Sequence, residues 1–114
     1  MAINKELLKG STVILILTLL DRKAMYGYEM IKEIEEKSEG IFTFKEGTLY
    51  PILHSLEAEG MVKCYWMETE GGRKRKYYEI TRLGKEHLKE KQEEWKVFSS
   101  AVDKVLWEGA VLSW

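Results

Sequence analysis

Four positively charged residues in succession form the part of this sequence best suited to binding an anion. They are Arg73, Lys74, Arg75 and Lys76. A Gly71-Gly72 pair precedes them, and two tyrosines, Tyr77 and Tyr78, follow. Glycines let a turn bring its backbone close to another molecule, and neighbouring cations without an acid among them bind the phosphates of nucleic acid. The segment therefore predicts a loop that contacts phosphate groups.

Other chemistries find little support in the residue types and their spacing. The two histidines, His54 and His87, fall on different predicted helices, and the single cysteine, Cys64, falls in a predicted strand. The sequence has no nucleophile next to a base and no cluster of metal-ligand residues at short spacing. One cysteine also excludes an intrachain disulfide and a cysteine-based zinc site. We expect no enzymatic activity, no metal and no cofactor.

A helix must position the residues that precede the cationic loop. Four apolar residues recur at the spacing of one helical face, and Gly60 suits the end of such a helix. These four are Leu49, Ile52, Leu53 and Leu56. The opposite face has short polar and aromatic groups that either reach base edges in a major groove or simply meet water. That face consists of Thr48, Tyr50, Pro51, His54 and Ser55.

The start of this helix has two candidate positions. Thr43 and Glu46 match a capping box, whereas Thr48 offers a later cap. Pro51 favours the later start, because a proline in the first turn of a helix loses no hydrogen bond. We place the start near Glu46 and expect strain or looseness around Gly47.

Two predicted strands follow the helix and meet at the glycine turn. Residues 61–68 and 76–80 are rich in Val, Tyr, Trp and Ile, which is typical of strands. Alternation puts Cys64 and Trp66 on one face of the first strand, and one face must cover the leucine stripe. The other face has Lys63, Tyr65 and Met67. A helix followed by a basic hairpin predicts a winged helix-turn-helix, of the α+β class and mostly α, which binds DNA.

Two helices are expected before this module. Residues 5–20 are apolar on nearly every face, which predicts a helix sandwiched in the core or in a subunit interface. Gly10-Ser11 is a possible loop or kink within it. Residues 27–38 form an amphipathic helix with one apolar side, and Gly40 suits its end. The inward residues of that second helix are Met30, Ile31 and Ile34.

Tyrosines flank the start of the second helix, where free backbone N–H groups can meet a phosphate. Packing of both rings with their hydroxyls in water is an equal alternative. Together with two lysines near other helix ends, they complete the predicted DNA-contacting set. The set is Lys9, Tyr26, Tyr28, Lys45, Thr48, Tyr50, Pro51, His54, Arg73, Lys74, Arg75 and Lys76.

A long last helix is predicted from Arg82 to about Leu106, with Thr81 as its cap. Its apolar residues recur in heptads, and the winged module before it is already complete, so a second copy of the chain is expected to cover them. These residues are Leu88, Trp95, Phe98, Val102, Val105 and Leu106. We therefore divide the chain into a DNA-binding domain, 1–80, and a dimerisation helix with a short tail, 81–114. The pattern predicts no structure for the tail after 106.

Composition sets limits on the function classes. The 114 residues are 45% hydrophobic and 32% charged, with a net charge of −1, which excludes a protein that coats nucleic acid through bulk charge. Residues 45–82 contain seven Lys and Arg against six Asp and Glu, so the basic signal is confined to the turn. With no signal peptide and no apolar run long enough to cross a bilayer, we expect a cytoplasmic protein without a membrane partner.

The sequence resembles short PadR-family transcriptional regulators over about residues 7–100. The resemblance rests on residues 7–20, Tyr26 to Glu29, and Gly47 to Pro51 with Leu53, Leu56 and Gly60. It continues through Gly71 to Tyr78 and Thr81 to Gly84. Glu46 departs from the family pattern, where a small residue or proline is common. The resemblance implies a dimeric, usually repressing regulator that releases its operator when a small molecule binds.

Some short relatives hold flat aromatic compounds at the dimer interface against a tryptophan of the last helix. Trp95 matches that tryptophan, and two indoles across a two-fold axis would form a slot for a planar ring. Simple packing of Trp95 in the dimer core is the alternative. The ligand-binding residues that this resemblance implies are Leu8, Val13, Leu88, Trp95 and Phe98.

Two functions therefore remain open from the sequence. The first is a regulator, a repressor as is usual for the family it resembles. It binds a pseudo-palindromic duplex as a homodimer and responds to a planar aromatic effector. The second is a winged-helix interaction module that dimerises without binding specific DNA, which the near-neutral charge favours.

Overall fold

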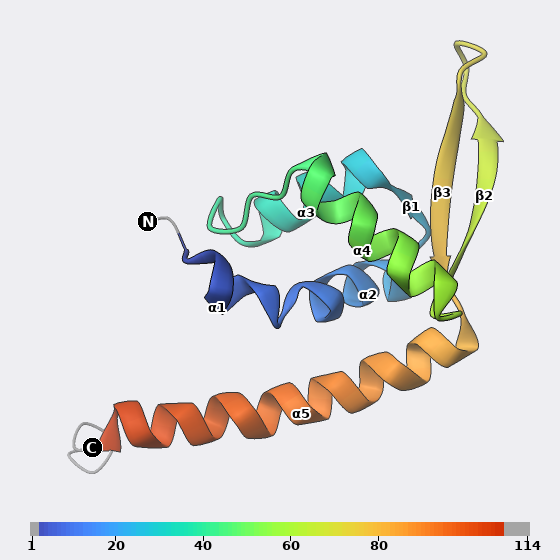
Figure 1. The fold of residues 1–114 in the computed structure, drawn as a ribbon. Helices are drawn as coiled ribbons and strands as arrows, with labels where there is room; N and C mark the ends of the chain where they lie inside the picture. The colour runs from blue at the N-terminus through green and yellow to red at the C-terminus, as the bar shows by residue number, and fades with distance from the viewer. Residues whose placement is uncertain (1–2, 109–114) are drawn as a thin grey trace.

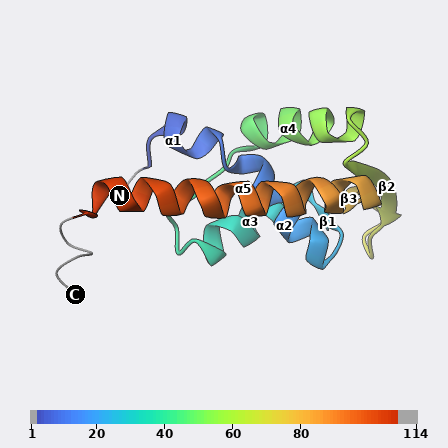
Figure 2. The same cartoon turned by 90° about the horizontal axis from the view of Figure 1, so that it is seen from below.

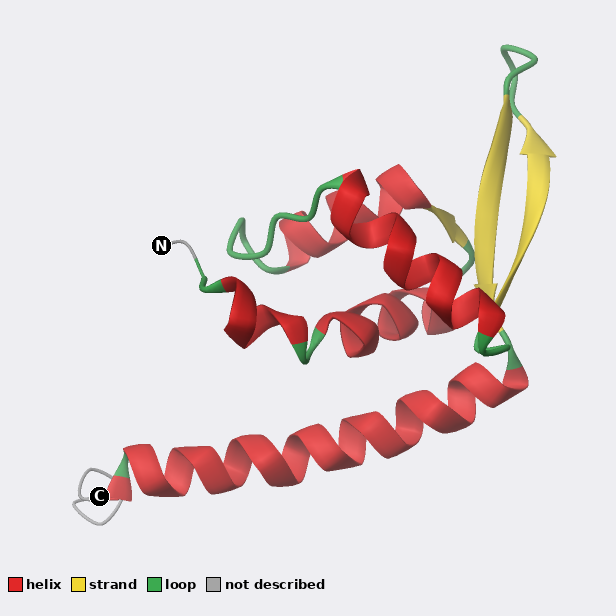
Figure 3. Cartoon of the chain, in the orientation of Figure 1, coloured by secondary structure: helices red, strands yellow, loops and turns green. Residues whose placement is uncertain are grey.

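The computed structural model describes residues 3–108, which form a winged helix-turn-helix with a long last helix (Figure 1). The helices are α1 (Lys5–Lys9), α2 (Thr12–Arg22), α3 (Gly27–Lys37), α4 (Glu46–Ala58) and α5 (Arg82–Leu106). The strands are β1 (Met25–Tyr26), β2 (Val62–Glu68) and β3 (Lys74–Ile80). Figure 3 shows that helix predominates over strand, so the predicted α+β class is confirmed.

The apolar segment at residues 5–20 is two helices rather than one continuous helix. The hydroxyls of Ser11 and Thr12 donate hydrogen bonds to the Leu8 carbonyl oxygen, at 2.9 and 3.2 Å. These bonds occupy the carbonyl that would otherwise propagate the helix through Gly10. The chain therefore breaks at the anticipated place. Only α2 is central: Ile16 and Leu17 are fully buried, while Leu7 in α1 is 73% exposed.

Helices α3 and α4 form the helix-turn-helix, and both lie close to the predicted positions. Helix α4 begins at Glu46, as expected, but neither predicted threonine cap forms, and no side chain caps its start. Pro51 lies in the second turn and not in the first, so the helix lacks one backbone hydrogen bond there. Gly47 has ordinary helical backbone and no left-handed φ, so the expected strain is absent at that residue.

The leucine stripe of α4 packs into the core as predicted, with Leu49, Leu53 and Leu56 buried. The hairpin covers the stripe with the face that contains Val62 and Cys64. Farther along the same face, Trp66 lies beyond the helices and is 63% exposed.

The sheet has one strand that the sequence did not predict. Its strands are antiparallel in the order β1-β3-β2, with β1 only two residues long. Tyr26 pairs with Tyr77, which in turn pairs with Tyr65 on β2. Strand β3 also begins at Lys74, two residues earlier than predicted, so three of the four consecutive cations lie within the strand.

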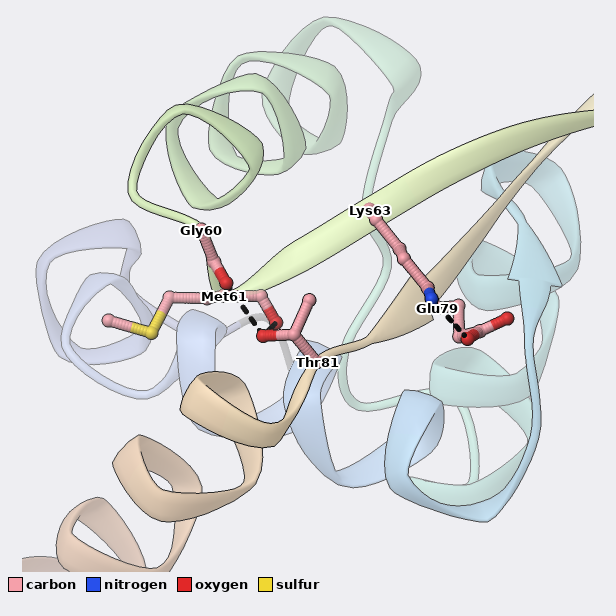
Figure 4. A network of polar contacts seen from close by, with 5 residues as sticks. All are labelled: Gly60, Met61, Lys63, Glu79 and Thr81. Carbon is pink, nitrogen blue, oxygen red and sulfur yellow. Dashed lines mark hydrogen bonds and ion pairs between the residues drawn. The ribbon is translucent and has the colours of Figure 1, made fainter.

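A compact junction joins the base of the hairpin to α5 (Figure 4). The Thr81 hydroxyl lies 2.6 Å from the carbonyl oxygen of Gly60 and 3.0 Å from that of Met61, and its proton serves one of them at a time. The Thr81 hydroxyl oxygen also accepts a hydrogen bond from the Gly84 backbone N–H at 3.0 Å, which confirms Thr81 as the cap of α5. Nearby, Lys63 pairs with Glu79 across the two strands at 3.3 Å.

Helix α5 has the predicted bounds and runs beneath α2 along the underside of the helical body (Figure 2). Its first turns pack within the chain, and Leu88 is only 3% exposed, so this residue of the heptad already has a cover in its own chain. Farther along, Phe98 is 59% exposed and Val105 79%. The tail after 106 lies mostly outside the described residues. No helix within residues 3–108 combines the length and the apolarity needed to cross a bilayer.

Candidate nucleic-acid interface

The hairpin, the start of α3 and the start of α4 lie on the side of the molecule away from α5 (Figure 1). The hairpin projects well beyond the helices on that side. Side chains connect the hairpin to the start of α3. The Arg75 guanidinium lies 4.4 Å from the centre of the Tyr26 ring, and the Tyr26 ring meets Tyr77 edge to face at 5.5 Å. The structure thus brings the predicted tyrosine and the predicted basic loop into contact.

The turn at the tip of the hairpin has the expected glycine geometry. The Thr69 backbone N–H and side-chain hydroxyl both donate to the Arg73 carbonyl oxygen, each at 2.8 Å. Gly72 has a φ of +79°, which favours glycine over every other residue. Arg73 and Lys74 are exposed at this tip, where their charges are free to meet a phosphate.

The other two cations of the run are held against the protein. Arg75 lies over Tyr26, as described above. The Lys76 ammonium lies 4.0 Å from the Glu57 carboxylate of α4 and 5.3 Å from the centre of the Tyr78 ring. The four cations that look equivalent in the sequence therefore have different surroundings in the fold.

Tyr50 of α4 packs against the first residue of α3. A Cβ atom added to Gly27 would overlap the Tyr50 hydroxyl and ring, so only glycine leaves room for this contact. Burial raises the pKa of the Tyr50 hydroxyl, and the nearby Glu46 carboxylate adds to the rise. The hydroxyl therefore stays protonated at neutral pH and keeps a proton to donate.

The face of α4 that the sequence assigned to a major groove is spread over a wide arc. Thr48 and His54 are exposed, as is Lys45 just before the helix. In contrast, Pro51 and Ser55 border a groove of about 290 Å³ that also includes residues of α2 and α5. This edge of α4 faces away from the hairpin.

Two other predicted contact residues differ in their placement. Tyr28 is 52% exposed in the first turn of α3, with the Lys32 ammonium 5.8 Å from the centre of its ring. Lys9 ends α1, at the end of the molecule far from the hairpin (Figure 1). The structure thus keeps Tyr28 with the hairpin side and separates Lys9 from it within one chain.

Sequence reasoning missed two residues that shape this surface. Gly27 lies in the motif Tyr26 to Glu29 but acts through its contact with Tyr50, and Glu57 acts through contacts with the hairpin, so no local pattern assigns either residue its role. The pairing of β1 with β3 places Tyr26 next to Tyr77. A strand of two residues is too short to show an alternation of apolar and polar residues, so the sequence did not predict this pairing.

The predicted ligand-binding residues lie on the opposite side of the molecule. Trp95 borders two hollows, of about 510 and 450 Å³, between α5 and the segment formed by α1 and α2. Val13 and Phe98 line the larger, and Leu8 lines the smaller. Leu88 lines neither and belongs to the core. Within the described range, no group of His, Cys, Asp and Glu side chains is arranged to hold a metal ion.

Known proteins with the same arrangement are transcriptional regulators. Residues 16–90 match the family described as transcriptional regulator PadR-like. A transcriptional regulator from Clostridium thermocellum has a similar structure, with a TM-score of 0.81 and 35% identity over 88% of this chain and 97% of its own. A PadR family transcriptional regulator from Eggerthella lenta has a TM-score of 0.78 and 33% identity, over 89% of this chain and 86% of its own.

Sequence relatives agree with the solved structures. A protein from Lysinibacillus sphaericus is 36% identical over 101 residues, which are 89% of this chain and 93% of that protein. The transcriptional regulator YqjI of Escherichia coli is 34% identical over 85 residues, but the match spans only 39% of its length. Because the family match extends from α2 through the hairpin into α5, the chain belongs to the PadR-like family of DNA-binding transcriptional regulators.

Proposed function

We propose that the protein is a repressor that binds a pseudo-palindromic operator as a homodimer and releases it when a planar aromatic compound binds. One observation carries the proposal: the hairpin and the starts of α3 and α4 lie on one side, and α5, whose far half exposes apolar side chains, lies on the other (Figure 1). DNA and a second copy of the chain can therefore bind at the same time. In a two-fold dimer the two copies of α4 would meet successive major grooves.

On the DNA side, each group has a role that fits its chemistry. Arg73, Lys74 and Arg75 would hold phosphates from the hairpin, and Thr48 and His54 would reach base edges. A second set of residues would support the docking of α3 and α4 on the backbone of the duplex. These are Tyr26, Tyr28, Lys45 and Tyr50; Lys9 and Pro51 are left out, because they lie away from the hairpin side of the chain.

The salt dependence of DNA binding tests the role of the hairpin. Replacing Arg73 and Lys74 with alanine should weaken binding to every duplex and reduce the slope of log K against log salt by about two, since each lost phosphate contact removes about one unit. Lys85→Ala with Lys89→Ala is the matched control, because it removes the same charge from exposed positions on α5. Equal slopes for the wild type and the hairpin variant would refute the assignment.

On the other side, a second copy of the chain is the proposed cover for the far half of α5. Five exposed apolar side chains form the heptad stripe of this half: Trp95 45%, Phe98 59%, Val102 37%, Val105 79% and Leu106 62%; Val97, 70% exposed, lies off that stripe. Leaving such a stripe in water costs about 25 cal/mol for each Å². Phe98→Glu with Val105→Glu should give a monomer in sedimentation equilibrium. Ser100→Glu, which adds a carboxylate off the stripe, should leave a dimer, and a monomeric wild type would disprove the pairing.

The effector site is proposed at Trp95. Its ring lies 5.9 Å from that of Phe98, at an interplanar angle of 37°, and the hollow beside it has room for a flat ring. A planar aromatic dye should quench tryptophan fluorescence in the wild type and in Trp107→Phe, and should fail to do so in Trp95→Phe. Equal quenching in all three proteins would favour simple packing of Trp95.

A dimerisation module without specific DNA binding is the second candidate, favoured by the net charge of −1. A gel shift on random duplex at two salt concentrations separates the candidates. A regulator should bind at low salt and lose affinity at high salt, whereas the module should not bind at either.

A further inference from the structure

A cluster of four polar side chains lies where the hairpin leaves the helical body. Glu57 comes from α4, Cys64 from β2, and Lys76 and Tyr78 from β3. The Cys64 thiol donates a hydrogen bond to one Glu57 carboxylate oxygen at 2.7 Å. The Lys76 ammonium lies 4.0 Å from the other oxygen of the same carboxylate. Glu57, on α4, the second helix of the helix-turn-helix and here called the recognition helix, therefore contacts both strands of the hairpin.

The cluster is shielded from solvent more than the tip of the hairpin. The Lys76 side chain is 29% exposed and that of Glu57 36%. Tyr78, which pairs with Cys64 across the strands, is 1% exposed, and its hydroxyl has no hydrogen-bond partner among the described residues. Among the four consecutive cations, Lys76 alone forms an ion pair within the part of the chain that the structure describes.

Strand geometry explains why Lys76 differs from Lys74. The two side chains lie on the same face of β3, two residues apart, which is about 7 Å along a strand. Lys74 is nearer the tip and exposed, and Lys76 is nearer α4. The face that holds both also contains Trp66, which pairs with Lys76 across the hairpin. Lys76 is therefore the cation of the run that lies within reach of Glu57 on α4.

We propose that Glu57 is a positioning residue that fixes the hairpin against the recognition helix and withholds Lys76 from the DNA. The proposal rests on the proposed function and extends it: three cations of the run, and not four, would act on phosphates. It also gives Cys64 a structural role as a hydrogen-bond donor. Removing the Glu57 charge would let the hairpin change its angle to α4. It would also leave the Lys76 ammonium without its carboxylate partner.

The single cysteine provides a test that needs no DNA. In the wild type the protonated thiol is half-buried and donates a hydrogen bond to Glu57, so it should react slowly with Ellman's reagent. Glu57→Gln and Glu57→Ala should react about five to ten times faster, because the thiol loses its charged acceptor. Glu59→Gln is the matched control, since it neutralises an exposed acid two residues further on, at the C-cap of α4. An unchanged rate in both Glu57 variants would overturn the positioning role.

The salt slope of duplex binding tests the consequence for DNA. Lys76→Met alone should leave the slope unchanged, because Lys76 makes no phosphate contact in the wild type. Glu57→Gln should make the slope of log K against log salt steeper by about one. Adding Lys76→Met to this variant should restore the wild-type slope. A slope that falls by about one in Lys76→Met alone would show that Lys76 already contacts DNA, and the withholding would be wrong.

Variants at Cys64 give a second readout of the hydrogen bond. Cys64→Ser keeps a donor for Glu57 and should bind the operator like the wild type, whereas Cys64→Ala should bind several-fold more weakly with an unchanged salt slope. Equal affinity of the two variants would contradict the role of the donor. If the wild type binds no duplex at all, the proposed function fails, and the labelling rate alone then decides whether Glu57 holds the hairpin.

Discussion

Replacing Gly27 with alanine tests whether the contact between α3 and α4 depends on a missing side chain. The added Cβ would overlap the Tyr50 ring and hydroxyl, and all three of the closest atoms belong to Tyr50. Forcing extra volume into a packed contact costs about 1–3 kcal/mol. The backbone of Gly27 is not left-handed, so alanine also gains up to about 1 kcal/mol in helix propensity. We expect a net loss of about 1–2 kcal/mol in the free energy of unfolding.

The same substitution should behave differently when Tyr50 is absent. In a Tyr50→Ala background the obstructing atoms are gone, so Gly27→Ala should be neutral or stabilising by up to about 1 kcal/mol. The two positions should therefore couple by about 1–3 kcal/mol in a double-mutant cycle. Gly47→Ala is the control, because a Cβ there meets no atom within 4 Å. It should not destabilise the protein.

Urea unfolding measures all four proteins of the cycle. Each should be unfolded at one protein concentration, since a dimer makes stability depend on concentration. The midpoint and the slope m together show whether the change lies in stability or in the compactness of the denatured state. If Gly27→Ala costs the same with and without the Tyr50 ring, the close contact does not explain the glycine.

Two further predictions concern single side chains at the base of the hairpin. Thr81→Val should lower the free energy of unfolding by about 1–2 kcal/mol, because it removes the cap of α5 and the hydrogen bond to the Gly60 carbonyl oxygen. Thr81→Ser keeps the hydroxyl and should keep most of that stability. Thermal unfolding measures both variants. Tyr78→Phe should be neutral or stabilising by up to about 1 kcal/mol, since the buried hydroxyl has no partner in the described chain. Burial raises the pKa of Tyr78 in the folded chain, so ionisation of this tyrosine in the unfolded chain lowers stability as pH rises from the ordinary value of 10.0 through the folded value. Unfolding of Tyr78→Phe should therefore depend less on pH in this alkaline range, and an unchanged alkaline loss would contradict the assignment.

Local sequence patterns correctly predicted the parts of the fold that depend on neighbours along the chain. The stripe of Leu49, Leu53 and Leu56 identified α4, and the glycine turn identified the tip of the hairpin. Thr81 identified the start of α5 to the residue. Caps, turns and helical periodicity act over a few residues, so the local pattern contains the information that forms them.

Features that depend on contacts between distant residues could be read only from the folded chain. Strand β1 exists because it pairs with β3, and its two residues have no periodicity of their own. Glu57 separates the surroundings of Lys76 from those of Lys74, although the two lysines look alike in the sequence. Leu88 belongs to the core of its own chain, whereas heptad spacing alone assigned it to a partner. In each case the deciding partner is far away in the sequence, and packing alone brings the two together.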